Sequence, residues 1–288
     1  MCRLFGFRSS LRTHAHRSLV HAENALAEQA AAHPHGWGIG WYVGEDAYVI
    51  KSESAAHTSD SFRRAADQLE SNVFIAHVRR ATVGAVSPLN VHPFRSGRWL
   101  FAHNGTVHGF EALRPRMMQE IPAHLRGRIL GNTDTETLFF WLLARMCESG
   151  ACPDGRGEIE PERLGELLTD ATAELRHRAE QVGAERPILN FLLTNGDVFL
   201  AHRHGRELYF ATQKRLCADA ETCPQAKKVC LEARRPTGPV NHLIVASERI
   251  GDTDLWEEVP EGGLLMLSKD FRLSFRGPGL RLLAATAA

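Results

Sequence analysis

The sequence is poor in cysteine, in long apolar runs and in excess charge. Six cysteines among 288 residues are too few for a disulfide scaffold. No stretch approaches the ~18 apolar residues of a membrane span, and the first residues lack the apolar run of a secretory signal. Lys+Arg and Asp+Glu number 34 each, so the basic excess of a nucleic-acid binder is missing. We therefore expect a cytoplasmic protein without nucleic-acid or membrane partners.

Several cofactor and metal motifs are also missing. The sequence has no GxGxxG or GxxxxGK[ST] phosphate loop and no HExxH pair. Cys217, Cys223 and Cys230 recur at near-regular spacing beside Pro224, but metal sites usually contain a C-x₂₋₄-C pair, which these three do not form. The sequence thus predicts neither a cofactor nor a metal.

Hydrophobic periodicity predicts a mixture of helices and strands, and 43% hydrophobic residues suffice for a core. Thr133 and Glu136 fit a capping box at the start of a helix. The predicted helices cover 16–31, 60–70, 134–146 and 162–181, and the predicted strands cover 2–9, 37–43, 47–52, 73–78, 99–103, 188–194, 198–202, 207–211, 242–246, 264–267 and 272–275. This order lacks regular βα alternation. It fits two antiparallel sheets with helices outside them, and other α+β layouts equally well.

Four short clusters carry chemically useful side chains: Met1-Cys2, 77–82 (HVRRAT), 103–105 (HNG) and 133–136 (TDTE). Together and in this order they resemble the class II glutamine amidotransferases, and especially stand-alone bacterial members that begin MCRLFGF or similar. The segments 33–42 (HPHGWGIGWY), 90–94 (NVHPF) and 245–259 (VASERIGDTDLWEEV) are also similar to that group. The resemblance implies an α+β fold, the four-layer αββα sandwich of N-terminal-nucleophile hydrolases. It implies one domain over 1–276, and we expect 277–288 to be a loosely held tail.

Cys2 is the expected nucleophile. Removal of Met1 would leave Cys2 with both a thiol and the free α-amine of the chain, and that amine, with a pKa of about 8, can accept the thiol proton. The alternative is a small buried cysteine in the first strand. The other three clusters favour the nucleophile.

Arg79 lies just after the predicted strand 73–78, where side chains project into clefts. Its guanidinium can grip a carboxylate with two hydrogen bonds, and the resemblance assigns it the α-carboxylate of the substrate. If the strand continues, Arg80 would point the other way, as a surface or structural charge. Thr82 would contribute a hydroxyl to the substrate site or fix the loop.

Asn104-Gly105 follows the predicted strand 99–103 and could supply two donors to an oxyanion, although an ordinary Asn-Gly turn is the alternative. Asp134 opens a predicted helix. An acid there stabilises the helix dipole, whereas the resemblance assigns it the α-ammonium group of the substrate. His35 departs from the family pattern, in which an Asp precedes Gly-Trp-Gly.

The function implied is hydrolysis of glutamine through a Cys2 thioester. The chain is too short for an added synthase domain, so the ammonia would pass to a separate acceptor subunit, or no acceptor exists. Stand-alone relatives also include a hydrolase of a γ-glutamyl conjugate in ergothioneine biosynthesis, and Arg79 and Asp134 could not distinguish the two substrates. A third alternative is an inactive binding or regulatory relative.

Overall fold

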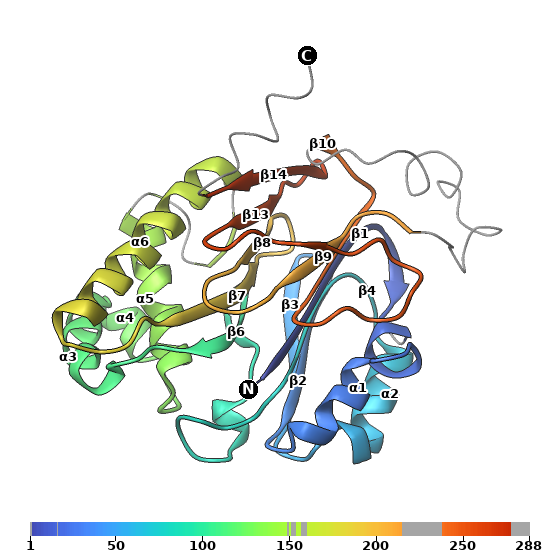
Figure 1. Cartoon of the computed structure of the whole chain (residues 1–288), viewed down its shortest axis with the longest axis horizontal. Coiled ribbons are helices and arrows are strands. Elements are labelled where there is room, and N and C mark those ends of the chain that lie inside the picture. The colour runs from blue at the N-terminus through green and yellow to red at the C-terminus, as the bar shows by residue number, and fades with distance from the viewer. Residues whose placement is uncertain are drawn as a thin grey trace.

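Two antiparallel sheets lie face to face at the centre of the molecule (Figure 1). The computed structural model describes residues 2–15, 17–148, 150, 154–156, 160–214 and 238–277. In order across the first sheet, the strands are β12 (Glu257–Glu258), β9 (Tyr209–Ala211), β11 (His242–Ala246), β1 (Arg3–His14), β4 (Glu70–Val78), β2 (Trp37–Val43) and β3 (Asp46–Ser52). The second sheet consists of β10 (Gly238–Pro239), β14 (Arg272–Arg276), β13 (Leu264–Leu267), β8 (Phe199–His202), β7 (Ile188–Thr194), β6 (Trp99–Thr106) and β5 (Phe94–Ser96).

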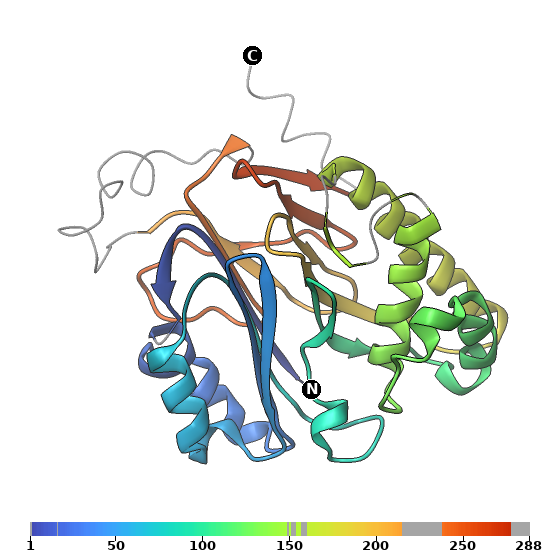
Figure 2. The ribbon, with the colours of Figure 1, turned by 180° about the vertical axis from the view of Figure 1, so that it is seen from behind.

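Helices cover the outer face of each sheet, which confirms the predicted αββα layering (Figures 1 and 2). The first sheet is covered by η1 (Arg17–His21), α1 (Leu26–Gln29), η2 (Ala30–Ala32), η3 (Ala56–Thr58) and α2 (Asp60–Gln68). The second sheet is covered by α3 (Phe110–Glu120), α4 (Ala123–Arg126), α5 (Asp134–Glu148) and α6 (Pro161–Gln181). A short turn, η4 (Pro88–Asn90), lies in the loop after β4.

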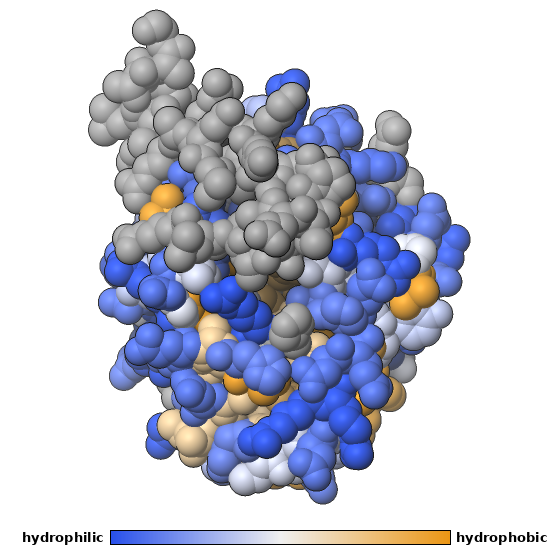
Figure 3. Space-filling model, turned by 90° about the vertical axis from the view of Figure 1, so that its right-hand side faces the viewer, coloured by the Kyte–Doolittle hydropathy of each residue, from blue (hydrophilic) through white to orange (hydrophobic). Residues whose placement is uncertain are grey.

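Apolar layers between the sheets and on the outer face of each sheet hold these elements together. Between the sheets, Leu4 packs with Leu192 and Phe199. Behind the second sheet, the ring of Phe101 stacks on Phe139 of α5, with centroids 5.2 Å apart. The outer surface over α1 and α2 is mostly hydrophilic, and hydrophobic residues show there only in small groups (Figure 3). Burial is thus concentrated between the layers, where it contributes most to stability.

The helix predicted over 16–31 is wrong as a continuous element. The chain there forms η1, then a turn in which Asn24 has a φ of 55°, and then α1, which continues directly into η2. Asn tolerates this left-handed conformation better than most residues, and its Nδ2 donates to Arg249 O at 2.9 Å. A contact more than two hundred residues away therefore stabilises the break.

Asn104 and Gly105 lie inside β6, opposite Asn190 and Leu189 of β7. The prediction that they follow the strand is therefore wrong, and so is the alternative of an Asn-Gly turn. Pairing with β7 extends the strand to Thr106, because sheet pairing overrides the local turn preference. The side chain of Asn104 is consequently fixed by the sheet.

Some predictions concern residues that the structure does not describe. Cys217, Cys223 and Cys230 lie in the segment 215–237, and the tail beyond 277 is likewise outside the described ranges. The division into a domain over 1–276 and a tail stays a prediction. None of the helices in the described ranges combines the length and apolarity that crossing a bilayer requires.

Candidate active site

Cys2 lies one residue before β1, and the register of β1 with β4 places it beside the chain that leaves β4. Arg3 pairs with Val78 in that register. The Cys2 Sγ–H donates to Arg80 O at 3.4 Å, and Sγ accepts the Arg80 N–H at 3.3 Å. The side chain is partly buried. The pairing of β1 with β4 and the two hydrogen bonds to the Arg80 backbone therefore fix the position of the sulfur.

Burial raises the pKa of the Cys2 thiol above its usual value. The Arg80 amide and the positive charge of Arg79 act in the opposite direction, and the negative charge of Asp134 adds to the rise. Because the net direction is upward, little thiolate exists at neutral pH, and a nucleophile at this position needs a base. The same interactions indicate that Arg79 and Asp134 share the electrostatic environment of Cys2.

Arg79 follows β4 directly and is buried, whereas the neighbouring Arg80 is exposed, as predicted. Its Nη1 donates to Ala85 O at 2.9 Å, and its Nη2 donates to Val83 O at 2.8 Å and to Gly84 O at 3.3 Å. Burial lowers the pKa of this guanidinium, although Cys2 and Asp134 oppose that change. Arg79 thus contacts its own loop, and three of its five donors are engaged there.

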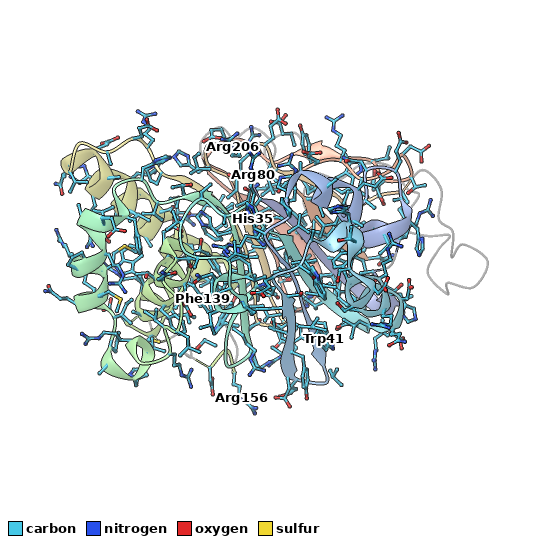
Figure 4. All side chains as sticks on the ribbon, turned by 90° about the horizontal axis from the view of Figure 1, so that it is seen from below. His35, Trp41, Arg80, Phe139, Arg156 and Arg206 are labelled. Atoms are coloured by element: carbon cyan, nitrogen blue, oxygen red, sulfur yellow. The ribbon has the colours of Figure 1, made fainter. Side chains whose placement is uncertain are left out.

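His35 takes part in holding the same loop. Its backbone N–H donates to Arg79 O at 3.0 Å, and its Nδ1 accepts the Ala81 N–H at 2.9 Å. Seen from below, His35 and Arg80 lie together between the two halves of the molecule (Figure 4). The position that departs from the family pattern therefore supplies a hydrogen bond that fixes the chain between Arg79 and Thr82.

Thr82 is exposed in this loop, and among the described residues its side chain makes no hydrogen bond. The far end of the loop is held instead by Asn90, which is 3% exposed. Its Nδ2 donates to Ala85 O and to Asn132 Oδ1, and its Oδ1 accepts the Asn132 N–H at 3.1 Å. Asn90 was not predicted as a site residue, although it lies in the family-like segment 90–94.

Asn104 is linked to the strand of Cys2 through Ser247. The Asn104 Nδ2 donates to Ser247 Oγ at 3.2 Å, and the same oxygen accepts the Leu4 N–H at 2.9 Å. Ser247 N–H in turn donates to Leu4 O at 3.0 Å. The Asn104 Oδ1 is buried and has no hydrogen-bond partner among the described residues. Sequence reasoning missed Ser247, whose only signal was its place in the family-like segment 245–259.

Gly105 is required by packing. A Cβ at this position would collide with Ile188 O and with the His103 ring. The His103 ring lies 2.9 Å from Ile188 O through Nε2 and 2.9 Å from Thr135 Oγ1 through Nδ1. The glycine thus permits a close approach of backbone that any side chain would prevent.

Asp134 opens α5 and is 4% exposed. Its Oδ1 accepts the Thr135 N–H at 2.8 Å, and its Oδ2 accepts the Val107 N–H just after β6, also at 2.8 Å. Thr133 Oγ1 accepts the Glu136 N–H at 3.2 Å, which confirms Thr133 as the cap. The Glu136 carboxylate reaches further back, to Leu130 and Gly131. Asp134 therefore lies in the first turn of the helix that Thr133 caps, and its carboxylate links this helix to the chain after β6.

Cys2 precedes β1, Arg79 follows β4, Asn104 lies in β6 and Asp134 opens α5. The charges of Arg79 and Asp134 act on the Cys2 thiol, and Asn104 is linked through Ser247 to Leu4. In the ranges that the structure describes, no group of three or more His, Cys, Asp or Glu side chains could hold a metal ion. A thiol, an amide, a guanidinium and a carboxylate suit recognition of an amino acid and nucleophilic attack on its side chain.

Comparison with known proteins agrees with this chemistry. A candidate glutamine amidotransferase of Escherichia coli, YafJ, is 23% identical over 91% of this chain and 95% of its own length. An uncharacterized protein of Methanocaldococcus jannaschii is 30% identical over 74% of this chain, which spans about half (55%) of that relative's length. The gamma-glutamyl-hercynylcysteine sulfoxide hydrolase of Mycobacterium tuberculosis is 40% identical over 75 residues, 25% of this chain and 31% of its own.

Solved structures share the fold. A glutamine aminotransferase class-II domain protein from Silicibacter pomeroyi has a TM-score of 0.61 at 19% identity and covers 96% of this chain and 98% of its own. The glutamine phosphoribosylpyrophosphate amidotransferase of Bacillus subtilis has a TM-score of 0.57 at 18% identity and covers 96% of this chain and 49% of its own. The family model described as glutamine amidotransferases class-II matches residues 1–275. This chain therefore belongs to the class II glutamine amidotransferases.

Proposed function

We propose that this protein hydrolyses the side-chain amide of glutamine through a thioester on Cys2, giving glutamate and ammonia. The observation that carries the proposal is the link from Asn104 through Ser247 to Leu4, because it fixes an amide donor relative to the strand that carries the thiol. An oxyanion donor is useful only when its position is fixed before the reaction.

The proposed steps use groups of this chain. Once Met1 is removed, the α-amine of Cys2 accepts the thiol proton, and the sulfur attacks the amide carbon. The carbonyl oxygen becomes an oxyanion, to which Asn104 Nδ2 and Gly105 N–H donate. The Asn104 amide has two hydrogens, and Ser247 engages one of them. Collapse expels ammonia, which takes the proton from the amine, and water then hydrolyses the thioester to glutamate and the free thiol.

Arg79 and Asp134 would bind the amino-acid end of the substrate. Arg79 has two donors that its loop does not use. Oδ1 of Asp134 accepts both the N–H and the hydroxyl of Thr135. Oδ2 accepts the Val107 N–H alone among the described residues, and so it keeps a lone pair for an ammonium group. Thr82 would add its hydroxyl from the loop. The guanidinium of Arg79 and the carboxylate of Asp134 together would select the zwitterionic end of an amino acid. They would make no contact with the group on the other side of the scissile amide bond.

The ammonia would pass to a separate acceptor subunit. Under this proposal the protein has low glutaminase activity alone and gains activity when its acceptor partner is added.

A second candidate keeps the chemistry and changes the substrate to a γ-glutamyl amide conjugate. The similarity to the M. tuberculosis hydrolase over 75 residues favours it. Glutamine and a γ-glutamyl amide present the same end to Arg79 and Asp134, so the two substrates differ only beyond the amide nitrogen. Turnover of glutamine and of several γ-glutamyl amides, measured side by side, decides between them.

The central test is the intact mass of the protein before and after exposure to a glutamine-mimicking diazoketone. We expect loss of Met1 and one covalent adduct, which Cys2→Ala abolishes while its circular dichroism stays unchanged. Cys147→Ala is the matched control, because Cys147 is another partly buried cysteine outside any disulfide, and it keeps the adduct. A processed chain that forms no adduct and turns over neither glutamine nor γ-glutamyl amides would contradict the proposal and favour an inactive relative.

A further inference from the structure

A cavity of about 500 Å³ lies where the two sheets meet at their edges. β3 ends the first sheet and β5 ends the second, and both contribute to the wall together with η4 and the start of α5. Neither Cys2 nor Arg79, Asn104 or Asp134 lines this cavity. It is therefore a separate space, which we call the edge pocket.

The edge pocket is lined by three basic side chains from three different elements. Lys51 of β3 lies with its Nζ 4.7 Å from the centroid of the Phe94 ring. Arg95 of β5 and Arg128, which follows α4, each use one donor on a neighbour: Arg95 Nη1 donates to Ala47 O, and Arg128 Nη1 donates to Ser96 Oγ. Four donors remain on each guanidinium.

Lys51 is the unusual member of this set. Its ammonium is half-buried, and within the described chain it has no hydrogen bond or ion pair. Burial lowers the pKa of this ammonium to about 8, although the carboxylate of Glu136 opposes the change. A half-buried cation that has no ion pair carries a desolvation cost, and an anion in the pocket would reduce that cost.

Glu136 is the single acid among the residues that line the pocket. Its two oxygens accept the N–H groups of Leu130 and Gly131, at 3.1 and 2.6 Å. Burial raises the pKa of this carboxyl group, and these amides and Lys51 oppose the rise. Its negative charge is thus partly engaged by backbone, and the pocket carries two positive charges more than negative ones.

The wall of the edge pocket also contains large hydrophobic side chains that are exposed to solvent. The described chain exposes seven large hydrophobic side chains, and three of them line this pocket: Tyr48, Leu89 and Leu130, at 44%, 51% and 69% exposure. Such residues scattered singly need no explanation, but a group of them beside charged residues marks a binding site. The aromatic ring of Phe94 lies beneath Lys51.

We propose that the edge pocket binds a small organic anion, a carboxylate or a phosphate attached to an apolar or aromatic body. The anionic group would lie against Lys51, Arg95 and Arg128. The apolar body would cover Tyr48, Leu89 and Leu130. This proposal does not depend on the activity proposed above, because none of the residues assigned to that chemistry lines the pocket.

Calorimetric titration of the full chain at pH 7 tests it, with phenyl phosphate and benzoate as anionic probes and benzyl alcohol and inorganic phosphate as partial probes. We expect saturable binding of at least one anionic probe, with a Kd on the order of a millimolar for so small a molecule. Benzyl alcohol and inorganic phosphate are expected to bind at least about fivefold more weakly, because each lacks one half of the recognised chemistry.

Two variants locate the binding. Lys51→Met and Arg128→Gln are each expected to weaken the anionic probe by about fivefold or more, in line with loss of one charge-assisted contact. Arg128 is exposed, so its variant tests the proposal even if Lys51→Met does not fold. Arg186→Gln, an exposed arginine outside the pocket, is the matched control and keeps wild-type affinity. Absence of saturable binding of both anionic probes, or equal affinity in Arg128→Gln and wild type, would overturn the proposal.

Discussion

The side-chain amide of Asn104 donates to the hydroxyl oxygen of Ser247, 143 residues away in sequence, at 3.2 Å. Ser247 also accepts the amide of Leu4, two residues after Cys2. One hydroxyl therefore connects the proposed oxyanion donor on β6 with the strand that carries the proposed nucleophile. Ser247 is close to the proposed chemistry without being assigned a step in it, and this makes it a positioning residue whose role can be measured.

Replacement of these two residues should have unequal effects. Asn104→Ala removes an oxyanion donor and is expected to lower kcat by about a hundredfold or more. Ser247→Ala keeps the donor and releases its position, so we expect a decrease in kcat of about tenfold with little change in KM. Steady-state kinetics on both variants measures the difference, and Ser247→Thr, which keeps the hydroxyl, serves as the control. Full activity in Asn104→Ala would show that Asn104 is only a strand residue.

Arg79→Lys is expected to weaken substrate binding. Lysine replaces a planar fork with a point charge, and it cannot hold the three loop carbonyls that Arg79 contacts. We expect kcat/KM to decrease by about tenfold or more, mainly through KM, which corresponds to about 1.4 kcal/mol. Arg80→Lys is the matched control, since Arg80 is adjacent and exposed. An equal effect of both variants would mean that the loop responds to any change there.

The pH dependence of the rate should follow the protonation of the α-amine base, and not the fraction of thiolate. Burial raises the pKa of the Cys2 thiol, so the thiol is protonated at neutral pH and must lose its proton to the α-amine. That amine accepts a proton only above its own pKa, about 8 in a free chain. The profile of kcat/KM is therefore expected to decrease as pH falls below this value and to level off above it. A flat profile between pH 6 and pH 9 would contradict the assigned base.

Stability should decrease in mild acid. Burial lowers the pKa of His202 to about 4, whereas an unfolded histidine titrates near 6.5. Between these values the unfolded chain binds a proton that the folded chain does not, so the free energy of unfolding falls as pH falls. His202→Phe keeps a ring against Phe191 and removes the titration. Urea unfolding measures the free energy of unfolding at pH 7 and at pH 5. The decrease between these two pH values is expected to be about 2 kcal/mol smaller in this variant than in the wild type.

The control for that experiment is His124→Gln, because His124 is exposed. It should lose as much stability between pH 7 and pH 5 as the wild type. If His202→Phe loses as much as the wild type too, the acid sensitivity belongs to other buried histidines such as His77 and His92, whose pKa values burial also lowers.

Elements with strong local signals were predicted well. The hairpin of β2 and β3, the helix that begins at Asp134 and the strand β7 agree with their predicted ranges, because alternation and capping act over a few residues. The α+β layering was predicted through family resemblance, and the order of elements alone left other layouts open. Helix α3 was not predicted. It contains Pro115, which argues against a helix unless packing compensates.

The site was only partly predictable. Cys2, Arg79, Asn104 and Asp134 were named from motifs, and their roles in the site stay predictions. Ser247 and Asn90 were missed because a single serine or asparagine carries no periodicity. Their contacts join segments far apart in sequence, Asn104 to Ser247 and Asn90 to Asn132. Such contacts follow from the sheet register, which local pattern does not determine.

The strand order has a consequence for biosynthesis. β1 pairs with β4 on one side and with β11 on the other, and Leu4 meets Ser247 across 243 residues. On the ribosome, the segment around Cys2 can dock on β4 early, but its second neighbour emerges only when most of the chain has been made. A nascent chain that stops before β11 would leave one edge of β1 open to other chains. Translation through residue 247 is thus the step that completes the neighbourhood of the thiol.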